Sequence, residues 1–455
     1  MFLSAQPSSR FITFVSMHIH FTWRFFLTIP TLALSCFVFS QKKNTSTTSE
    51  KSDLIITSNM QRNIDAMAKL SPDNIVPYLG SAFKTMGLKP YIDSSSFTQT
   101  FTLDVGKEIK PTTSLKINGV ALETGADYWP FSFSANGFFA GTLVWGETEN
   151  NQPFLFNLEP LLEKNKSISV AGLLQQIKQK AEELAAKKTP ALIVYNSSSI
   201  NDSLTFLAKD SSVNATIPII YFTKSGIVKL KSESSIAAAI DAQILIDKKI
   251  FNGTNAIAYL NNNASNTVII AGSTYNKIGI TTTLEVAQLL KDACSSTKNI
   301  NSIFNAADYL NNNYLFLYAN DSSIDDYGTG YFLNNLTDAF KINYGIKIGV
   351  TGAPTDTAHF LEISDEKSSK SWPSIFKNFD PLFNSKIDSS VFFNFGNINF
   401  YKKNIPVIYL FNPTPENATI NKTTTINKND VKTVYYIMQL ISSANKYGKL
   451  PYNTD

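Results

Sequence analysis

Asp321, Asp325 and Asp326 place three carboxylates close together in the sequence. Carboxylate oxygens bind Ca²⁺ and other hard cations, so one possible function of this stretch is to hold a single cation. Hard-cation loops, however, need a tighter ligand pattern and a glycine at a defined position, and neither is present here. We therefore favour a solvated acidic turn over a metal site.

His359 is the one histidine beyond the first forty residues, since His18 and His20 precede it near the amino terminus. It could act as a general base beside Asp356, but it is followed by apolar residues and no G-x-S-x-G nucleophile motif accompanies it. Cys294 follows a predicted helix and has no histidine close in sequence, which disfavours a thiol nucleophile. The sequence also contains no phosphate-binding or dinucleotide-binding glycine motif.

Composition places the chain among ordinary globular proteins. It has 455 residues, 43% of them hydrophobic, which is enough for about two or three domains with cores of their own. The formal net charge is only +4, and Arg10 and Arg24 of the amino-terminal segment contribute two of those charges. Nucleic acid is therefore not expected among its partners, because nucleic-acid binding requires a strongly basic surface.

The amino terminus has the pattern of a secretory signal peptide. Arg24 precedes a short apolar run that ends near Ser40, and lysines follow it. The pattern predicts a leader over residues 1–40 and a protein that is secreted or retained in the periplasm or cell envelope. A membrane anchor is the alternative, but Pro30 interrupts the run and the run is shorter than the roughly 20 residues that span a bilayer. No membrane span is expected after removal of the leader, and only Cys294 then remains, so no internal disulfide is possible.

Beyond a polar stretch at 44–53, expected to be flexible, hydrophobic periodicity alternates between strands and helices. The predicted helices cover residues 56–70, 170–187, 283–293, 331–335 and 431–447. The predicted strands cover residues 98–105, 114–120, 138–144, 191–195, 217–222, 267–271, 314–318, 346–350 and 405–411. This alternation predicts an α/β fold with a mixed, mostly parallel sheet flanked by helices on both faces.

Several motifs follow one another in the order of a known family. N-A-I-A-Y at 255–259 and T-V-I-I-A-G-S at 267–273 resemble the start of the catalytic domain of the secreted di-zinc aminopeptidases, where N-V-I-A-Y precedes V-V-I-G-A-H-x-D. G-T-G-Y-F at 328–332 is similar to the family's G-S-x-Y-F, and K-I-N-Y at 341–344 to its M-I-N-M. F-Y-K-K-N-I-P-V at 400–407 is similar to F-Y-K-K-D-I-P-V. The resemblance is to peptidase family twenty-eight of the MH-clan zinc metallopeptidases.

The resemblance covers roughly residues 55–447 and implies a division into domains. Residues 41–100 would form the first part of a peptidase-like domain of zinc-exopeptidase type, and residues 241–455 the rest of it. Residues 101–240, which include S-F-S-A-N-G at 132–137, resemble the smaller, β-rich protease-associated domain that such enzymes often carry as an insertion.

The family's chemistry depends on two zinc ions, and the resemblance implies where their ligands should lie. The H-x-D motif falls on Ser273 and Tyr275, and the G-x-x-D-N loop is deleted in front of the helix that contains 279–282. The remaining ligand positions fall on neutral residues: the paired glutamates on Ser322 and Ser323, the strand aspartate on Gly349, and the late histidine between Asn417 and Thr419. Such side chains cannot hold two divalent cations. We therefore expect no catalytic residues, no bound metal and no other cofactor; zinc would be expected only if the family's function persists.

The sequence therefore predicts a non-catalytic homologue of zinc aminopeptidases that binds a peptide or protein. The alternative is a residual metallo-aminopeptidase that removes amino-terminal residues from peptides through one remaining metal ion or a relocated site. A third possibility is a chain that is losing its function altogether. Whether the chain is an enzyme stays open at this point, with the balance against it.

Overall fold

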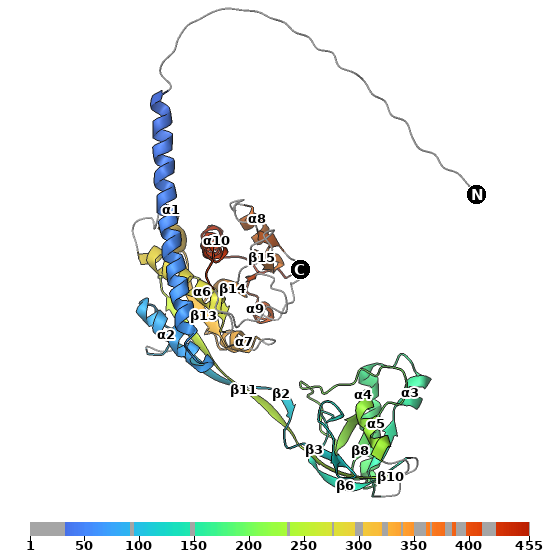
Figure 1. The fold of residues 1–455 in the computed structure, drawn as a ribbon. Coiled ribbons are helices and arrows are strands. Elements are labelled where there is room, and N and C mark those ends of the chain that lie inside the picture. Colours follow the sequence, from blue (N-terminus) through green and yellow to red (C-terminus); the bar gives the residue numbers. More distant parts are fainter. Residues whose placement is uncertain are drawn as a thin grey trace, which may run out of the picture.

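A computed structural model of the chain describes residues 32–91, 95–145, 151–233, 237–274, 277–295, 304–320, 326–337, 340–349, 361–364, 366–377, 385–387, 397–411 and 425–454. Within these residues the chain forms one large mixed sheet with helices on both faces and a second, smaller lobe (Figure 1). The predicted α/β class, with a mostly parallel sheet flanked by helices, is confirmed.

Nine strands of the described residues make up the central sheet, in the order β1-β11-β13-β12-β14-β17-β15-β16, with β2 paired to β11. Their bounds are β1 Lys89–Pro90, β2 Thr98–Ile109, β11 Ile246–Leu260, β12 Thr267–Ser273, β13 Asn313–Ala319, β14 Ile342–Ile348, β15 Leu361–Ser364, β16 Ser385–Ile387 and β17 Val407–Phe411. The neighbours β13, β12, β14 and β17 run parallel to one another. Every residue of β13 is buried, because helices cover both faces of the sheet here.

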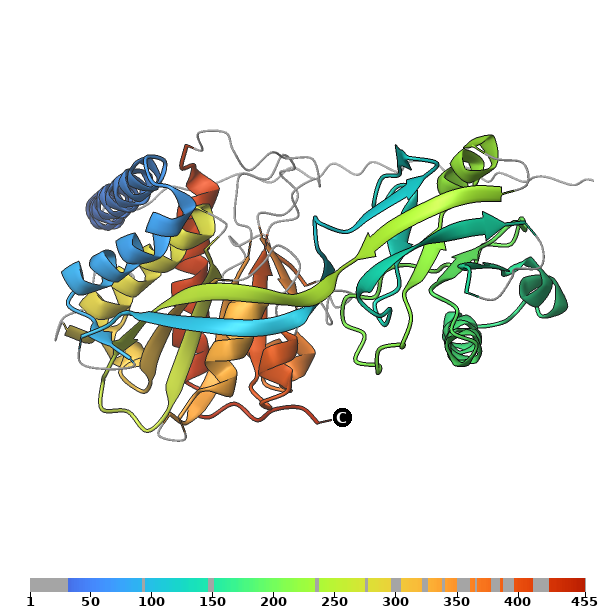
Figure 2. The ribbon, with the colours of Figure 1, turned by 90° about the horizontal axis from the view of Figure 1, so that it is seen from below.

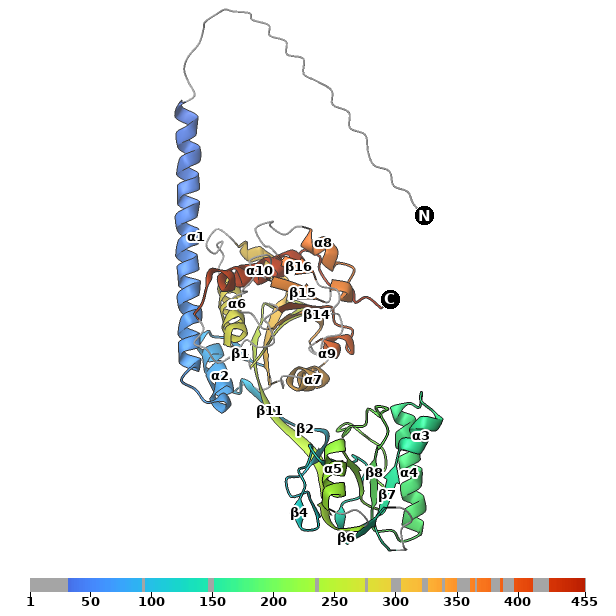
Figure 3. The same cartoon turned by 45° about the vertical axis from the view of Figure 1, so that its right-hand side comes forward.

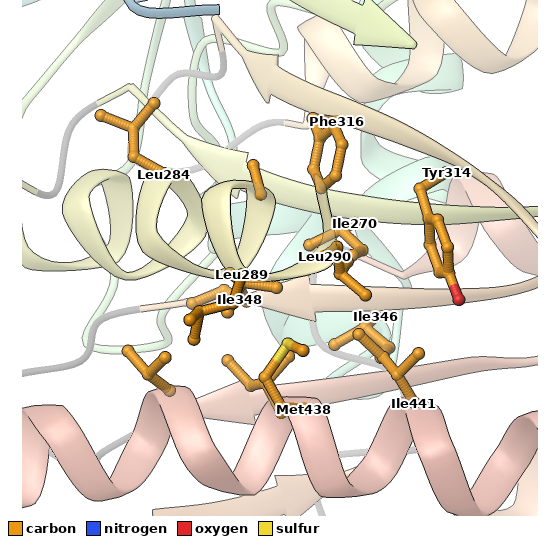
Figure 4. Packing of buried hydrophobic residues seen from close by; sticks show 14 of the residues in the cluster. Ile270, Leu284, Leu289, Leu290, Tyr314, Phe316, Ile346, Ile348, Met438 and Ile441 are labelled. Atoms are coloured by element: carbon orange, nitrogen blue, oxygen red, sulfur yellow. The ribbon is translucent and has the colours of Figure 1, made fainter. Parts of the chain in front are cut away.

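Two groups of helices cover the two faces. On one face lie α1 Leu32–Met67, α2 Ile75–Thr85, α6 Lys277–Ser295, α8 Trp372–Phe376 and α10 Lys428–Asn445, and on the other α7 Tyr327–Asn334 and α9 Ile398–Tyr401 (Figure 3). Figure 4 shows Leu290 of α6 and Met438 of α10 packed together with Ile346 of β14 in the larger core. Short 3₁₀ helices lie at Pro72–Asn74, Ala306–Tyr309 and Glu366–Ser368.

Helix α1 is longer than its predicted range of 56–70. It begins at Leu32 and includes residues 44–53, so the expectation of a flexible stretch there is wrong. The segment from Leu32 to Met67 contains no glycine or proline, and nothing in it terminates the helix. Only the carboxyl-terminal part packs on the body, through buried residues such as Met60 and Ile64, and the other end projects beyond it (Figure 1). Residues 1–31, which hold most of the predicted leader, lie outside the described residues; among the helices that are described, none has the length and apolarity needed to span a membrane.

A carboxyl group is buried where α1 packs on α6. The side chain of Glu285 accepts a hydrogen bond from Asn59 Nδ2 of α1 at 3.2 Å, and the residue is 4% exposed. Burial raises the pKa of Glu285 from its ordinary 4.5 to about 7, against the smaller opposing effects of the Asn59 hydrogen bond and the Arg62 charge. The charge of Asp292, which lies later in α6, raises the pKa of Glu285 slightly further.

This buried acid predicts a pH dependence of stability. Between about pH 4.5 and pH 7 the unfolded chain releases the Glu285 proton while the folded chain keeps it, so folding becomes less favourable as the pH rises, by about 3 kcal/mol in total. Glu285→Gln keeps the acceptor for Asn59 and removes the proton equilibrium. We expect the variant to be more stable than the wild-type chain at pH 8 and equally stable at pH 4, in urea unfolding followed by circular dichroism. Exposed Glu182→Gln is the control, and an equal gain from it would contradict this explanation.

The smaller lobe consists of residues 110–245, between β2 and β11, and is called the inserted lobe here (Figure 2). One of its sheets has the order β4-β3-β10-β6 and the other β5-β9-β8-β7. The bounds are β3 Ser114–Ile117, β4 Val120–Ala121, β5 Tyr128–Pro130, β6 Gly137–Val144, β7 Phe154–Asn157, α3 Glu159–Lys164, α4 Val170–Ala186, β8 Leu192–Tyr195, β9 Ile219–Phe222, α5 Lys224–Glu233 and β10 Ala237–Ile244. The predicted insertion at 101–240 overlaps this lobe; the kind of domain it represents stays a prediction.

The long ribbon of β2 and β11 joins the inserted lobe to the body. The two strands pair antiparallel from Ile109 and Ile246 at one end to Thr98 and Ala256 at the other. Aromatic rings hold the ribbon against α7. The ring centroids of Phe101 and Tyr331, which are stacked, lie 4.8 Å apart, and those of Phe251 and Tyr327 lie 5.0 Å apart. Because β11 is antiparallel to β13, the ribbon leaves the body at the carboxyl edge of the parallel strands.

Candidate functional site at the carboxyl edge of the sheet

The parallel strands create a place for a ligand through their connections. The chain leaves β12 toward α6 on one face of the sheet and leaves the neighbouring β13 toward α7 on the other face (Figure 3). In open α/β sheets, ligands bind in the crevice outside the carboxyl ends of two such strands. The carboxyl edge of β12, β13 and β14 is therefore the candidate site.

Three of the positions identified in the sequence lie at this edge. Ser273 ends β12, Asp326 directly precedes α7, and Gly349 directly follows β14. The other positions, Tyr275, Asp321, Ser322, Ser323, Asp325, His359, Asn417 and Thr419, lie outside the described residues, so their roles stay predictions. The helix with residues 279–282 begins at Lys277, soon after the end of β12.

The space around Gly349 is crowded. The ring of Tyr409, on the neighbouring strand β17, occupies the space where a side chain at position 349 would begin. The backbone N–H of Gly349 donates to Leu410 O at 2.8 Å, which holds the two strands together at this point. An aspartate at 349 would therefore need the ring of Tyr409 to move.

Asp326 forms a buried ion pair with Lys347 of β14. The distance from Nζ to Oδ1 is 2.5 Å, and the side chains are 8% and 3% exposed for the lysine and the aspartate. Asn399 of α9 donates from Nδ2 to the other carboxylate oxygen and to the backbone oxygen of Asp326, both at 3.1 Å. The expected solvated acidic turn is therefore wrong for Asp326, because the ammonium group of Lys347 on β14 balances the charge of the carboxylate inside the protein.

These residues do not suit a zinc centre. Protein zinc sites need three or four nitrogen, sulfur or oxygen ligands around each ion, and a pair of ions needs more. The described residues contain no group of three histidine, cysteine, aspartate or glutamate side chains arranged to hold a metal ion. The carboxylate of Asp326 is already engaged, and the ammonium group of Lys347 beside it repels a further cation.

Asn255 fastens the start of α7 to the sheet. It is fully buried in β11, and its Oδ1 accepts a hydrogen bond from the backbone N–H of Asn320 at 2.9 Å. Its Nδ2 donates to the backbone oxygen of Gly328 at 2.9 Å and to Gln99 Oε1 at 3.0 Å. One amide side chain thus holds both ends of the connection between β13 and α7, which carries Asp326.

The sequence analysis missed Lys347, Asn255 and Asn399. A signal for the first was present, since Lys347 stands between two isoleucines in an apolar strand, where a lone charge requires a buried partner. No comparable signal marks the asparagines, in a sequence with asparagine in many turns.

Cys294 lies away from this edge, near the start of β13. Asn262 Nδ2 donates to its Sγ at 3.2 Å, and burial raises the pKa of the thiol to about 11. The thiol therefore stays protonated at neutral pH, which agrees with the expectation that Cys294 is no nucleophile.

Comparisons with solved structures return aminopeptidases. An aminopeptidase from Aneurinibacillus sp. strain AM-1 is 16% identical, with a TM-score of 0.47 over 87% of this chain and 94% of that chain. The zinc aminopeptidase BSAP from Bacillus subtilis is 12% identical, with a TM-score of 0.42 over 88% and 95%. A Peptidase M28 precursor from Shewanella amazonensis is 10% identical, with a TM-score of 0.40 over 90% and 96%. No family model matches the chain. No curated protein sequence matches it.

Proposed function

We propose that the chain is a secreted, non-catalytic member of the di-zinc aminopeptidase family and that it binds a peptide or protein. The observation that carries the proposal is the ion pair of Asp326 and Lys347 at the carboxyl edge of the sheet. By the resemblance, two of the family's ligand positions correspond to Ser273 and Gly349 at this edge, where the buried cation is the ammonium group of Lys347. The pair is 2.5 Å apart and nearly inaccessible to water.

The ion pair supports a loss of metal chemistry. An ammonium group can balance the charge of a carboxylate, but it has no vacant coordination position and cannot lower the pKa of a bound water molecule. The closed space around Gly349 and the neutral side chain of Ser273 support the same conclusion. A peptidase-like fold without its metal chemistry can persist as a binding surface, because fold and function are separable.

Secretion rests on the predicted leader at residues 1–40. The inserted lobe, proposed here to be a protease-associated domain, extends the candidate site, because the β2–β11 ribbon carries it beyond the carboxyl edge. A peptide or protein that meets this edge would therefore also meet the inserted lobe.

A hydrolysis assay tests the non-catalytic part of the proposal. We expect the purified chain to release no p-nitroaniline above the blank from a panel of aminoacyl-p-nitroanilides, with or without added Zn²⁺. A Bacillus subtilis zinc aminopeptidase of the kind found above serves as the positive control. Turnover that rises with added Zn²⁺ and disappears with chelator would contradict the proposal and support the residual metallo-aminopeptidase.

A peptide array tests the binding part. We expect saturable binding of a subset of peptides to the purified chain. Absence of saturable binding across the array, from a chain that is folded by circular dichroism, would count against a peptide-binding role.

A further inference from the structure

A cavity lies at the edge of the central sheet opposite the candidate site. It has a volume of about 600 Å³ and opens beside the first residues of β14 and the residues that precede β17. Its other walls are the end of α7 and the carboxyl-terminal segment 449–452. Because β14 runs from this cavity to Gly349, the cavity is separated from the candidate site by the full length of the strand. The volume is in the range of small-molecule pockets.

The wall of the cavity is held in place by a buried asparagine. Asn343 of β14 is 1% exposed, and its Oδ1 accepts a hydrogen bond from the backbone N–H of Leu450 at 2.8 Å. Its Nδ2 donates to the backbone oxygen of Gly448 at 2.8 Å and to Asn312 Oδ1 at 3.1 Å. These bonds fix the carboxyl-terminal segment against the sheet, so the cavity is preformed.

The charged side chains among the described residues that line the cavity are of one sign. Lys403 and Lys449 line it, both are exposed, and within the described residues neither forms an ion pair with a carboxylate. Among the described residues that line the cavity there is no aspartate or glutamate. Two ammonium groups without counter-charges favour an anionic ligand.

The rest of the lining is mixed: Thr337 and Asn404 are polar, and most of the other residues are apolar. Leu333, Leu336, Phe340 and Tyr452 face the cavity and offer hydrocarbon and aromatic surface. An inorganic anion would leave this surface uncovered, whereas an organic anion with an apolar body would cover it and gain free energy from its burial.

The backbone of the walls argues against an extended peptide as the ligand. The backbone N–H groups of Phe340, Ile405 and Leu450 already donate within the chain, to Thr337 O, Phe400 O and Asn343 Oδ1. A peptide that adds as a strand needs free backbone groups along an edge. Recognition here therefore falls to side chains, which suits a small molecule.

We propose that this cavity binds a small organic anion, a carboxylate or sulfonate on an aliphatic or aromatic body, with its acid group at Lys403 and Lys449. The site is independent of the candidate site at the carboxyl edge, and the proposal does not depend on whether that edge binds peptides.

The test uses two dyes of similar shape and different charge, the anionic 8-anilinonaphthalene-1-sulfonate and the uncharged N-phenyl-1-naphthylamine. We expect saturable fluorescence enhancement of the anionic dye with the full-length chain, and displacement of the dye by dodecanoate. In the double variant Lys403→Glu, Lys449→Glu we expect about tenfold weaker binding of the anionic dye, because two favourable charge interactions become repulsive. The uncharged dye should bind both proteins equally.

Lys164→Glu, Lys166→Glu is the matched control, since these lysines are exposed on the inserted lobe and carry the same change in net charge. The proposal is overturned if the control weakens the anionic dye as much as the cavity variant does, or if the cavity variant binds it as tightly as the wild-type chain. Lys403→Gln, Lys449→Gln, which should weaken binding by a smaller factor, distinguishes the loss of attraction from repulsion. Thermal unfolding shows that each variant is folded.

Discussion

Lys347→Met is expected to lower the free energy of unfolding by about 3–5 kcal/mol, because it removes one partner of a buried ion pair and leaves the other charged. The carboxylate of Asp326 is 3% exposed, and among the described residues the amide of Asn399 is its remaining hydrogen-bond donor once the ammonium group is removed. Methionine has nearly the length of the lysine stem, so the loss reports the charge and not a cavity. Urea unfolding followed by circular dichroism measures it.

Two further variants separate the ion pair from a general effect of losing a lysine. The double variant Lys347→Met, Asp326→Asn removes both charges and should recover a large part of the loss. Lys187→Met removes the surface partner of Glu183, a pair at 2.7 Å whose lysine side chain is 58% exposed, and should cost no more than about 0.5 kcal/mol. Equal losses from Lys347→Met and Lys187→Met would contradict the account of a buried pair.

Asn255→Leu is expected to lower the free energy of unfolding by about 2–6 kcal/mol, since it leaves two buried backbone groups without their partner, at about 1–3 kcal/mol each. These groups are the N–H of Asn320 and the oxygen of Gly328, which bind the two ends of the Asn255 amide. Leucine has a similar volume, so the loss comes from hydrogen bonding. Thermal and urea unfolding measure it.

Asn255→Asp separates the contribution of the acceptor of the Asn255 side chain from that of its donor. The aspartate keeps an acceptor for the N–H of Asn320 but provides no donor for the oxygen of Gly328 and adds a buried charge. We expect it to destabilise the chain most at neutral pH and less at acidic pH, where the carboxyl group is protonated and can donate. A loss for Asn255→Leu below about 1 kcal/mol would mean that these backbone groups find other partners.

The regular elements of the fold were predictable because each is specified by neighbouring residues. The helix predicted at 170–187 is α4, Val170–Ala186, and its alternating apolar and charged residues are set by a single face buried in the inserted lobe. The apolar run at 314–318 is β13, whose residues are all buried between two layers of helices. Local periodicity carries such information.

Elements with weaker local patterns were missed. Helix α2 contains Pro77 and Gly80, which disfavour a helix, but the proline lies in the first turn, where no hydrogen bond is lost. Strand β11 is not among the predicted strands, because its first half is solvated ribbon and its burial there follows no simple alternation. The first half of β11 is a strand because it pairs with β2, and not because of a periodicity in its own residues.

The sequence identified residues of the candidate site but not their arrangement. Ser273, Asp326 and Gly349 were candidates from motifs and residue types, but their common place at the carboxyl edge follows from the strand order, and the partner of Asp326 comes from another strand. Lys347 lies on β14, which is separated from β13 in the sheet by β12. Sequence spacing does not report such a contact, so the acidic stretch was interpreted as solvated surface.

The most direct test of the central claim is the metal content of the full-length chain, purified without chelator and measured by elemental mass spectrometry, together with a calorimetric titration with Zn²⁺. Because the ammonium group of Lys347 already balances the carboxylate at this edge, we expect less than about 0.1 equivalent of bound zinc and no saturable heat of binding. One or two equivalents of tightly bound zinc would contradict the account and support the alternative function, a residual metallo-aminopeptidase.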